Sequence, residues 1–152
     1  KHLKTMGNGS NFKNWGNNVF SFCIPIPSHR SHYKNISIEL FYTEDDLKTL
    51  DSGGKRLFFT NEIKASKTIH TDLTTNKTEI VENYIRLETP MIINEFAKKI
   101  YDQDASKIVD SSGNQVAISK AIFAENVIKG IDDFAKVKFT EFKEIFKIIE
   151  NI

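Results

Sequence analysis

The chain has 152 residues, 39% of them hydrophobic and 11% aromatic, which excludes a disordered protein and suits one domain with a buried core. Its 21 lysines and arginines nearly balance 20 aspartates and glutamates, which excludes the strong basicity of a DNA-coating protein but leaves a local basic face open. No apolar run approaches the ~20 residues that cross a bilayer, and the single cysteine has no internal disulfide partner. We therefore expect a cytoplasmic protein with no membrane partner.

Residues 1–18 are polar and rich in glycine and asparagine, which predicts a connector ahead of a single domain over residues 19–152. Two aromatic residues, Phe12 and Trp15, interrupt the connector. We expect them to anchor it on the core, and stacking on a nucleic-acid base is the alternative. Because the first residue is a lysine and not a methionine, we expect the chain to be a fragment of a longer protein.

Three short β-strands are predicted in the N-terminal half. Residues 19–26 are β-branched and aromatic and end at two prolines, which is typical of a buried strand, with Cys23 as a small buried apolar residue. Residues 36–41 alternate between apolar and other side chains, which favours a second strand. Residues 55–63 are the third candidate.

A short helix and a turn separate the last two of these strands. Thr43 has the character of an N-cap, and the acidic residues after it suit the first turn of a helix that runs to about Leu50. Residues 51–54, Asp-Ser-Gly-Gly, predict a tight turn. Farther along the chain we expect a strand or hairpin around residues 68–73 and a helical turn near residues 79–84.

Helical signals dominate the C-terminal part. Thr89 followed by Pro90 predicts a helix over residues 89–102, and Ser119 and Gly130 carry the start and stop signals of a second helix. Between these helices, the Asp-Ser-Ser-Gly sequence ending at position 113 predicts a turn.

A third helix is predicted from Thr140 onward. Its apolar residues follow helical spacing on one face: Phe142, Ile145, Phe146 and Ile149. Ile148 and Ile152 lie outside that face, which leaves apolar surface for another subunit or for the rest of a longer chain. Strands precede helices, so the fold class is α/β or α+β, with a small N-terminal sheet packed by three C-terminal helices.

Carboxylates in the first half of the chain are the candidate metal ligands. Glu39 lies in the second predicted strand, and Asp45 and Asp46 begin the helix after it. Carboxylate oxygens that converge from strand ends and a helix start hold Mg²⁺ or Mn²⁺ in phosphodiester-cleaving sites. The alternative is that the acidic residues of the helix only complement its N-terminus.

A second acidic pattern has the form Asp…Glu-x-Lys. Asp51 is followed eleven residues later by Glu62, Ile63 and Lys64. In such an arrangement the carboxylate faces a metal ion while the lysine faces the attacking water or the phosphate. We therefore take Glu39, Glu62 and Lys64 as candidate catalytic residues.

Basic residues supply candidate nucleic-acid contacts. The turn after the first predicted strand carries four of them, and two more open the third strand: His29, Arg30, His32, Lys34, Lys55 and Arg56. Together they would form a basic face for phosphates. For the turn, a solvated loop is the alternative.

The segments GNNVFSFCIPIP, ISIELFYTEDDL, GKRLFF and NEI, with ISKAIFAENVI and FTEFKEIFKII near the end, resemble the C-terminal half of bacterial defence-associated Toprim-type nucleases, the overcoming-lysogenization-defect-like proteins. These are often fused behind an ATPase. In such domains a strand leads into an Ile-Glu-x-aromatic segment, which residues 38–42 resemble. The metal-binding Glu and Asp-x-Asp motifs of the family are not present upstream of Gly16, so the resemblance implies a fragment with accessory acidic residues.

The sequence is compatible with three hypotheses of function. The first is a metal-dependent nuclease domain, or a fragment of one, from a bacterial defence protein, with Mg²⁺ or Mn²⁺ as its cofactor. The second is a non-catalytic module that binds nucleic acid through the basic residues. The third is a protein-interaction domain whose helical end docks on a homo-oligomeric partner or on the rest of a longer chain.

Overall fold

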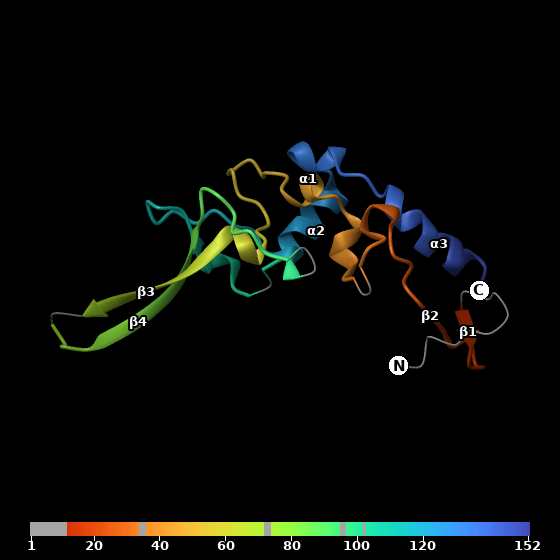
Figure 1. Ribbon diagram of the computed structural model, residues 1–152, viewed down its shortest axis with the longest axis horizontal. Coiled ribbons are helices and arrows are strands. Elements are labelled where there is room, and N and C mark those ends of the chain that lie inside the picture. Colours follow the sequence, from red (N-terminus) through yellow and green to blue (C-terminus); the bar gives the residue numbers. More distant parts are fainter. Residues whose placement is uncertain (1–11, 34–35, 72–73, 95–96, 102) are drawn as a thin grey trace. The chain divides into compact units, whose positions relative to one another are not determined.

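The computed structural model describes residues 12–33, 36–71, 74–94, 97–101 and 103–152, and Figure 1 shows their helices and strands. The contacts cluster into two compact units. Unit 1 combines Lys1–Thr43 with Lys138–Ile152, and unit 2 is Glu44–Val137. The expectation of one domain over residues 19–152 stays a prediction.

The described elements include two small β-sheets and three α-helices, which confirms the mixed α/β fold class. None of the described helices is long and apolar enough to cross a membrane.

Unit 1 begins with two short antiparallel strands, β1 (Phe12–Asn14) and β2 (Phe20–Phe22). β1 lies inside the segment predicted as a connector. β2 is much shorter than the strand predicted over residues 19–26, because pairing with β1 ends at Phe22 and two prolines follow soon after. Cys23 is exposed, so the prediction that it is buried is wrong.

The predicted strand over residues 36–41 is also wrong, because Ile38–Phe41 forms a 3₁₀ helix. The N–H of Leu40 donates to the carbonyl of Ser37 at 3.0 Å, and the N–H of Tyr42 donates to that of Glu39 at 3.2 Å. This turn buries the adjacent residues Leu40 and Phe41, whereas a strand would place them on opposite faces.

The last helix, α3 (Lys143–Glu150), follows a 3₁₀ turn at Thr140–Phe142 and starts three residues after the predicted N-cap. Phe142 packs against Phe41, with ring centroids 5.1 Å apart. The buried residues of α3 are Ile145 and Ile148. The predicted apolar face is therefore wrong in part, because Ile148 was placed outside it and two of its expected members are exposed.

Unit 2 is built on a long antiparallel hairpin, β3 (Ile63–Thr71) and β4 (Thr78–Arg86), which extends away from the rest of the unit in Figure 1. The strand or hairpin expected around residues 68–73 is confirmed at residues 68–71, which belong to a longer hairpin than predicted; residues 72 and 73 lie outside the described residues. The helical turn expected at residues 79–84 is wrong, because these residues belong to β4.

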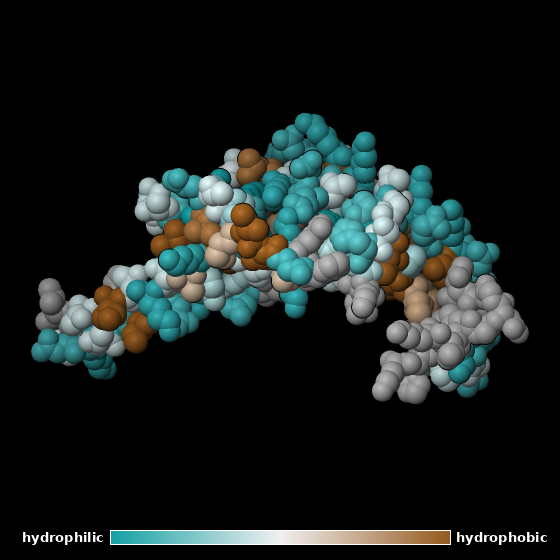
Figure 2. All heavy atoms as spheres, viewed as in Figure 1, coloured by the Kyte–Doolittle hydropathy of each residue, from teal (hydrophilic) through white to brown (hydrophobic). Residues whose placement is uncertain are grey.

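β4 also pairs in parallel with β5 (Ile108–Val109), but only at Tyr84 and Ile85. A core of Phe58, Ile63, Ile108 and Ala117 lies beside this junction. The distal half of the hairpin is exposed, and Figure 2 shows hydrophobic residues there; the cross-strand neighbours Ile69 and Ile80 are among them.

The strand predicted over residues 55–63 does not form. Arg56 and Phe59 make isolated bridges to Ala117 and Ile100, and Thr60–Glu62 is a 3₁₀ turn that leads into β3. The turn at residues 51–54 is confirmed: the Asp51 Oδ1 atom accepts hydrogen bonds from two backbone N–H groups, at 2.9 and 2.8 Å.

The helix predicted over residues 89–102 is also wrong at the described positions, 89–94 and 97–101; residues 95, 96 and 102 lie outside the described part of the chain. The N–H of Met91 donates to the carbonyl of Asn61 at 2.8 Å, and the Asn61 Nδ2 group donates back to the carbonyl of Met91 at 3.1 Å. The N–H of Thr60 donates to the carbonyl of Lys99 at 2.8 Å. Backbone groups of this segment thus bond to the turn before β3, and a single local bond, from the N–H of Ala97 to the carbonyl of Asn94 at 2.8 Å, is described within it.

Two helices of unit 2 agree with the sequence. α1 (Glu44–Leu47) begins where predicted, although it ends before Leu50. α2 (Lys120–Lys129) has both predicted caps: the Ser119 hydroxyl accepts from the N–H of Ile122 at 3.2 Å, and Gly130 has a left-handed φ of 60°. The turn that ends at position 113 is also confirmed, with the Asp110 carboxylate accepting two backbone N–H groups.

Candidate functional site

A bidentate charged contact in unit 2 joins Arg56 to Glu62. The two Nη atoms of Arg56 donate to the two carboxylate oxygens of Glu62, each at 3.0 Å. The N–H of Phe59 donates to the same carboxylate at 2.9 Å, and the guanidinium lies 4.0 Å from the Phe58 ring centroid. The Glu62 side chain is only 5% exposed. Both of its oxygens are therefore engaged in holding the turn before β3.

The net effect on the Glu62 carboxyl is a lowered pKa. Burial by itself raises the pKa of Glu62, but the hydrogen bonds from Arg56 and Phe59 and the positive charges of Arg56 and Lys48 outweigh it, so the pKa lies below the ordinary 4.5. The carboxylate is thus ionised and paired at neutral pH. This arrangement is typical of a structural ion pair.

Two lysines extend the cluster. Lys48 Nζ lies 3.5 Å from Glu62 and 3.6 Å from Glu44, and Lys98 forms an ion pair with Glu44. Both ammonium groups lie over the Phe59 ring, at 5.6 and 4.7 Å from its centroid. Each of the two carboxylates, Glu44 and Glu62, thus has two cationic neighbours.

The other members of the Asp…Glu-x-Lys pattern have separate local roles. Asp51 holds its own turn through backbone N–H groups. Lys64 is exposed in the first part of β3, where it pairs across the ladder with Ile85. Because both oxygens of Glu62 are bonded to Arg56, the side chains of Asp51, Glu62 and Lys64 do not converge on one point where a metal ion and a phosphate could bind.

The predicted metal ligands belong to different units. Glu39 is half-buried in the 3₁₀ helix of unit 1, whereas Asp45 and Asp46 lie in the first turn of α1 in unit 2. Within the described ranges, no group of three or more histidine, cysteine, aspartate or glutamate residues is arranged to hold a metal ion. Binding of Mg²⁺ or Mn²⁺ stays a prediction that this geometry does not support.

In the basic turn of unit 1, one of the predicted phosphate contacts is buried. Arg30 is 5% exposed, with its guanidinium 5.8 Å from the Tyr33 ring. His29 lies 3.8 Å from Glu141, and His32 is exposed beside Tyr33. Lys34 lies outside the described residues. A buried arginine does not reach a phosphate, so the turn offers fewer contacts than the sequence indicates.

The two basic residues of unit 2 also have partners within the unit. Lys55 Nζ donates to the side chain of Gln115 at 3.3 Å, and Arg56 is held by Glu62. The nucleic-acid-binding face therefore stays a prediction, because Arg30 is buried and Lys55 and Arg56 are bonded within unit 2.

Trp15 is exposed and is not anchored in a core. Its Nε1–H donates to the Ser21 hydroxyl at 2.8 Å, and Lys13 Nζ lies 3.7 Å from the ring centroid. The indole is thus held against the two-stranded sheet by polar contacts.

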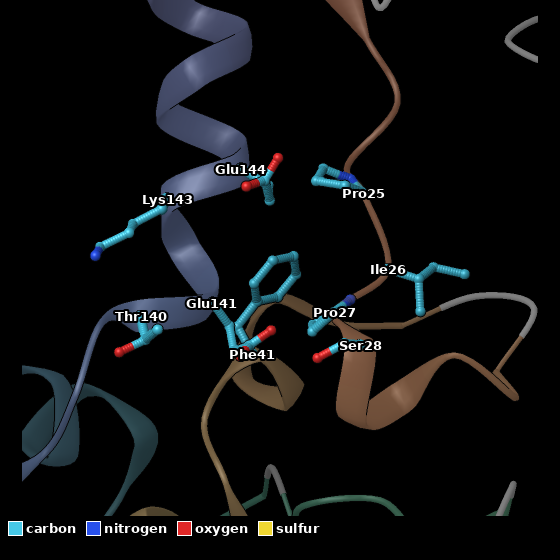
Figure 3. Close-up of a pocket in the computed structure, with 9 residues that line it drawn as sticks. All are labelled: Pro25, Ile26, Pro27, Ser28, Phe41, Thr140, Glu141, Lys143 and Glu144. Carbon is cyan, nitrogen blue, oxygen red and sulfur yellow. The ribbon is translucent and has the colours of Figure 1, made fainter.

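Sequence reasoning missed a cavity of about 470 Å³ in unit 1. Its wall comes from three separate segments: Pro25, Ile26, Pro27 and Ser28 on one side, Phe41 at the base, and Thr140, Glu141, Lys143 and Glu144 on the other side (Figure 3). The proline pair was visible in the sequence, but no local pattern links it to residues more than 100 positions away.

Sequence reasoning also underestimated the exposed side of α3. Phe146 is 53% exposed and Ile149 is 50% exposed. The helical spacing in the sequence identified Phe146 and Ile149 as members of an apolar face, but the prediction placed that face against the core.

No family model, curated protein or solved structure matches this chain, so its function is argued from the geometry described above.

Proposed function

We propose that this chain is a protein-interaction module that pairs with a second copy of itself along α3. The observation that supports the proposal is a helix with apolar residues on two sides. Ile145 and Ile148 are buried, while Phe146 and Ile149 are each about half exposed on the adjacent side. A helix that only covered its own core would carry polar residues there.

The exposed side has the spacing that another helix recognises. Phe139, Phe142, Phe146 and Ile149 follow steps of three, four and three residues, the spacing of a helix–helix seam, although Phe139 precedes the 3₁₀ turn and only Phe146 and Ile149 lie in α3. Phe142 is half-buried in the aromatic cluster and the other three are exposed. We call Phe146 and Ile149 the α3 row, because they lie on the helix itself.

The charges beside the α3 row favour a second copy in the antiparallel direction. Lys143 and Glu150 lie at opposite ends of α3 and on the same side of the row. In an antiparallel pair, each Lys143 faces Glu150 of the other copy, and Phe146 packs against Ile149 of the other copy. A parallel pair would place Lys143 and Glu150 of the two copies on opposite sides of the seam, so these charges would not meet.

The exposed area sets the strength of this association. Half-exposed side chains of this size present roughly 100 Å² each, so two residues from each of two copies bury roughly 400 Å². At about 25 cal/mol per Å² this contributes about 10 kcal/mol, against an association cost of about 4–15 kcal/mol. At the lower cost about 6 kcal/mol remains, so we expect a weak dimer, with a Kd of about 50 μM to 1 mM.

Sedimentation equilibrium across that concentration range tests the proposal. We expect the unmodified chain to dimerise and Phe146→Asp to remain monomeric while folded, because Phe146 is not part of the core. Ile128→Asp is the matched control: Ile128 is 83% exposed on α2, and its replacement leaves dimerisation unchanged. A chain that stays monomeric up to ~1 mM, or a Phe146→Asp variant that still dimerises, refutes the proposal.

Charge exchange tests the antiparallel direction. Lys143→Glu and Glu150→Lys each place like charges together and weaken the dimer, and the double variant restores it. If the double variant is no better than the two single ones, the antiparallel arrangement is wrong.

A further inference from the structure

The cavity of unit 1 combines an apolar wall with two carboxylates. Pro25, Pro27 and Phe41 supply apolar surface, and Glu141 and Glu144 line the opposite side. Figure 3 shows the Glu144 side chain across from Pro25, with the Phe41 ring below both in this view. A volume of about 470 Å³ lies within the range of small-molecule sites.

Among the described residues that line the cavity, Lys143 is the one cation. Its ammonium group points away from the cavity in Figure 3. Lys147 donates to Glu144 at 2.6 Å, in a pair whose two side chains are both more than half exposed. Exposed pairs of this kind contribute little in water, so the carboxylate is able to exchange this partner for a ligand.

Glu141 is the more enclosed of the two carboxylates. Its side chain is 31% exposed and lies 3.8 Å from His29 Nδ1. Neither ring nitrogen of His29 has a hydrogen-bond partner among the described residues, although both are shielded from solvent. His29 is not part of the cavity lining, so the Glu141 carboxylate is the acceptor that this side of the cavity offers to a hydrogen-bond donor.

From this arrangement we infer that the cavity binds a small organic cation, a primary ammonium group on an alkyl chain. The alkyl chain lies against the two prolines and Phe41, and the ammonium group donates to Glu141 and Glu144. An anion would meet two carboxylates, and a neutral alcohol would lose the charge-assisted hydrogen bonds. The inference goes beyond the proposed self-association and does not depend on it.

Amide chemical shifts of isotope-labelled protein, titrated with hexylammonium chloride, test the inference, with hexanol and sodium hexanoate as probes of matched length. We expect hexylammonium to shift the amides of Glu141, Lys143 and Glu144, and to bind at least about tenfold more tightly than either matched probe. Equal binding of hexanoate, or no shift at these amides, overturns the inference.

Two sets of variants separate the carboxylates from nonspecific effects. The Glu141→Gln, Glu144→Gln double variant should lose at least about tenfold in affinity for hexylammonium, whereas Glu150→Gln, at an exposed carboxylate outside the cavity, should not. Glu144→Lys should reverse the preference toward hexanoate while the fold is kept, because Glu144 is exposed. Unchanged affinities in these variants overturn the inference.

The Phe146→Asp variant distinguishes the proposed dimer from the proposed cation site. Phe146→Asp should abolish self-association and leave hexylammonium binding unchanged, because Phe146 is not part of the cavity lining. Loss of hexylammonium binding in Phe146→Asp would overturn the inference of an independent site.

Discussion

Replacing Arg56 with methionine is the sharpest test of the charged cluster in unit 2. The substitution keeps most of the side-chain volume but leaves the Glu62 carboxylate buried without its bidentate partner. Removing one member of a buried pair costs about 3–5 kcal/mol. Lys48 at 3.5 Å and the N–H of Phe59 still contact the carboxylate, so we expect the lower value, a loss of about 3 kcal/mol in the free energy of unfolding at pH 7.

Urea unfolding followed by far-ultraviolet circular dichroism measures this loss. Trp15 is the single tryptophan and belongs to unit 1, so its fluorescence reports separately on that unit. The Arg56→Met, Glu62→Met double variant is the control, because it removes both charges. We expect it to be more stable than Arg56→Met alone, since no charge is left buried.

The effect also depends on pH in a defined direction. Because the folded-state pKa of Glu62 is lowered, its stabilising contribution is complete above the ordinary value of 4.5 and is lost as pH falls through the folded pKa. In Arg56→Met, protonation at low pH removes the unpaired charge. The difference in stability between the two proteins should therefore shrink between pH 7 and about pH 3. A loss below about 1 kcal/mol at pH 7, or a difference that does not change with pH, would refute this account of the pair.

Two further predictions concern unit 2. Ser119→Ala removes the side-chain acceptor for the N–H of Ile122 and should lower the unfolding free energy by about 1 kcal/mol in urea titrations, whereas Ser111→Ala, at an exposed turn position, should change it much less. Burial, with the neighbouring Tyr84, raises the pKa of Tyr101 to about 12, so ultraviolet titration should show one tyrosine ionising near that value, and Tyr101→Phe should remove that step. Because the folded state retains this proton, stability should fall as pH rises above the ordinary tyrosine value of 10.0; a titration with no tyrosine near 12 would contradict the burial of Tyr101.

The features that the sequence predicted correctly are those fixed by a few neighbouring residues. The two aspartate turns form because a carboxylate two positions before a glycine pair or a serine reaches backbone N–H groups nearby. The ends of α2 follow from Ser119 and Gly130 for the same reason. Each of these signals acts within one turn of chain, so no distant partner is able to override it.

The predictions that failed depended on partners far along the chain. Residues 89–102 have helical spacing, but Met91 instead bonds to Asn61, 30 residues earlier. Alternation over residues 36–41 is equally compatible with a 3₁₀ turn that buries two adjacent side chains, and the apolar cluster around Phe41 decides between them. Tertiary packing overrides local propensity at both places.

The candidate site was predicted less well than the fold. The sequence identified Glu62 as an important carboxylate, but it did not reveal that Arg56 would neutralise it through a 3₁₀ turn. The cavity of unit 1 joins residues near position 26 to residues near position 142, and no spacing rule relates them. Charged residues are recognisable from sequence, whereas their partners are set by the fold.

The long hairpin of unit 2 has a consequence for the order of folding. Its nine paired positions join residues that are close in the sequence, so the loop that must close is short and hairpins of this kind form within microseconds. The bridge between Arg56 and Ala117 closes a much longer loop, and the parallel pairing of β4 with β5 requires the intervening chain to return. We expect the hairpin to form early and the bridge that brings residue 117 beside residue 56 to form late, so the rate of folding of unit 2 is set by the second event.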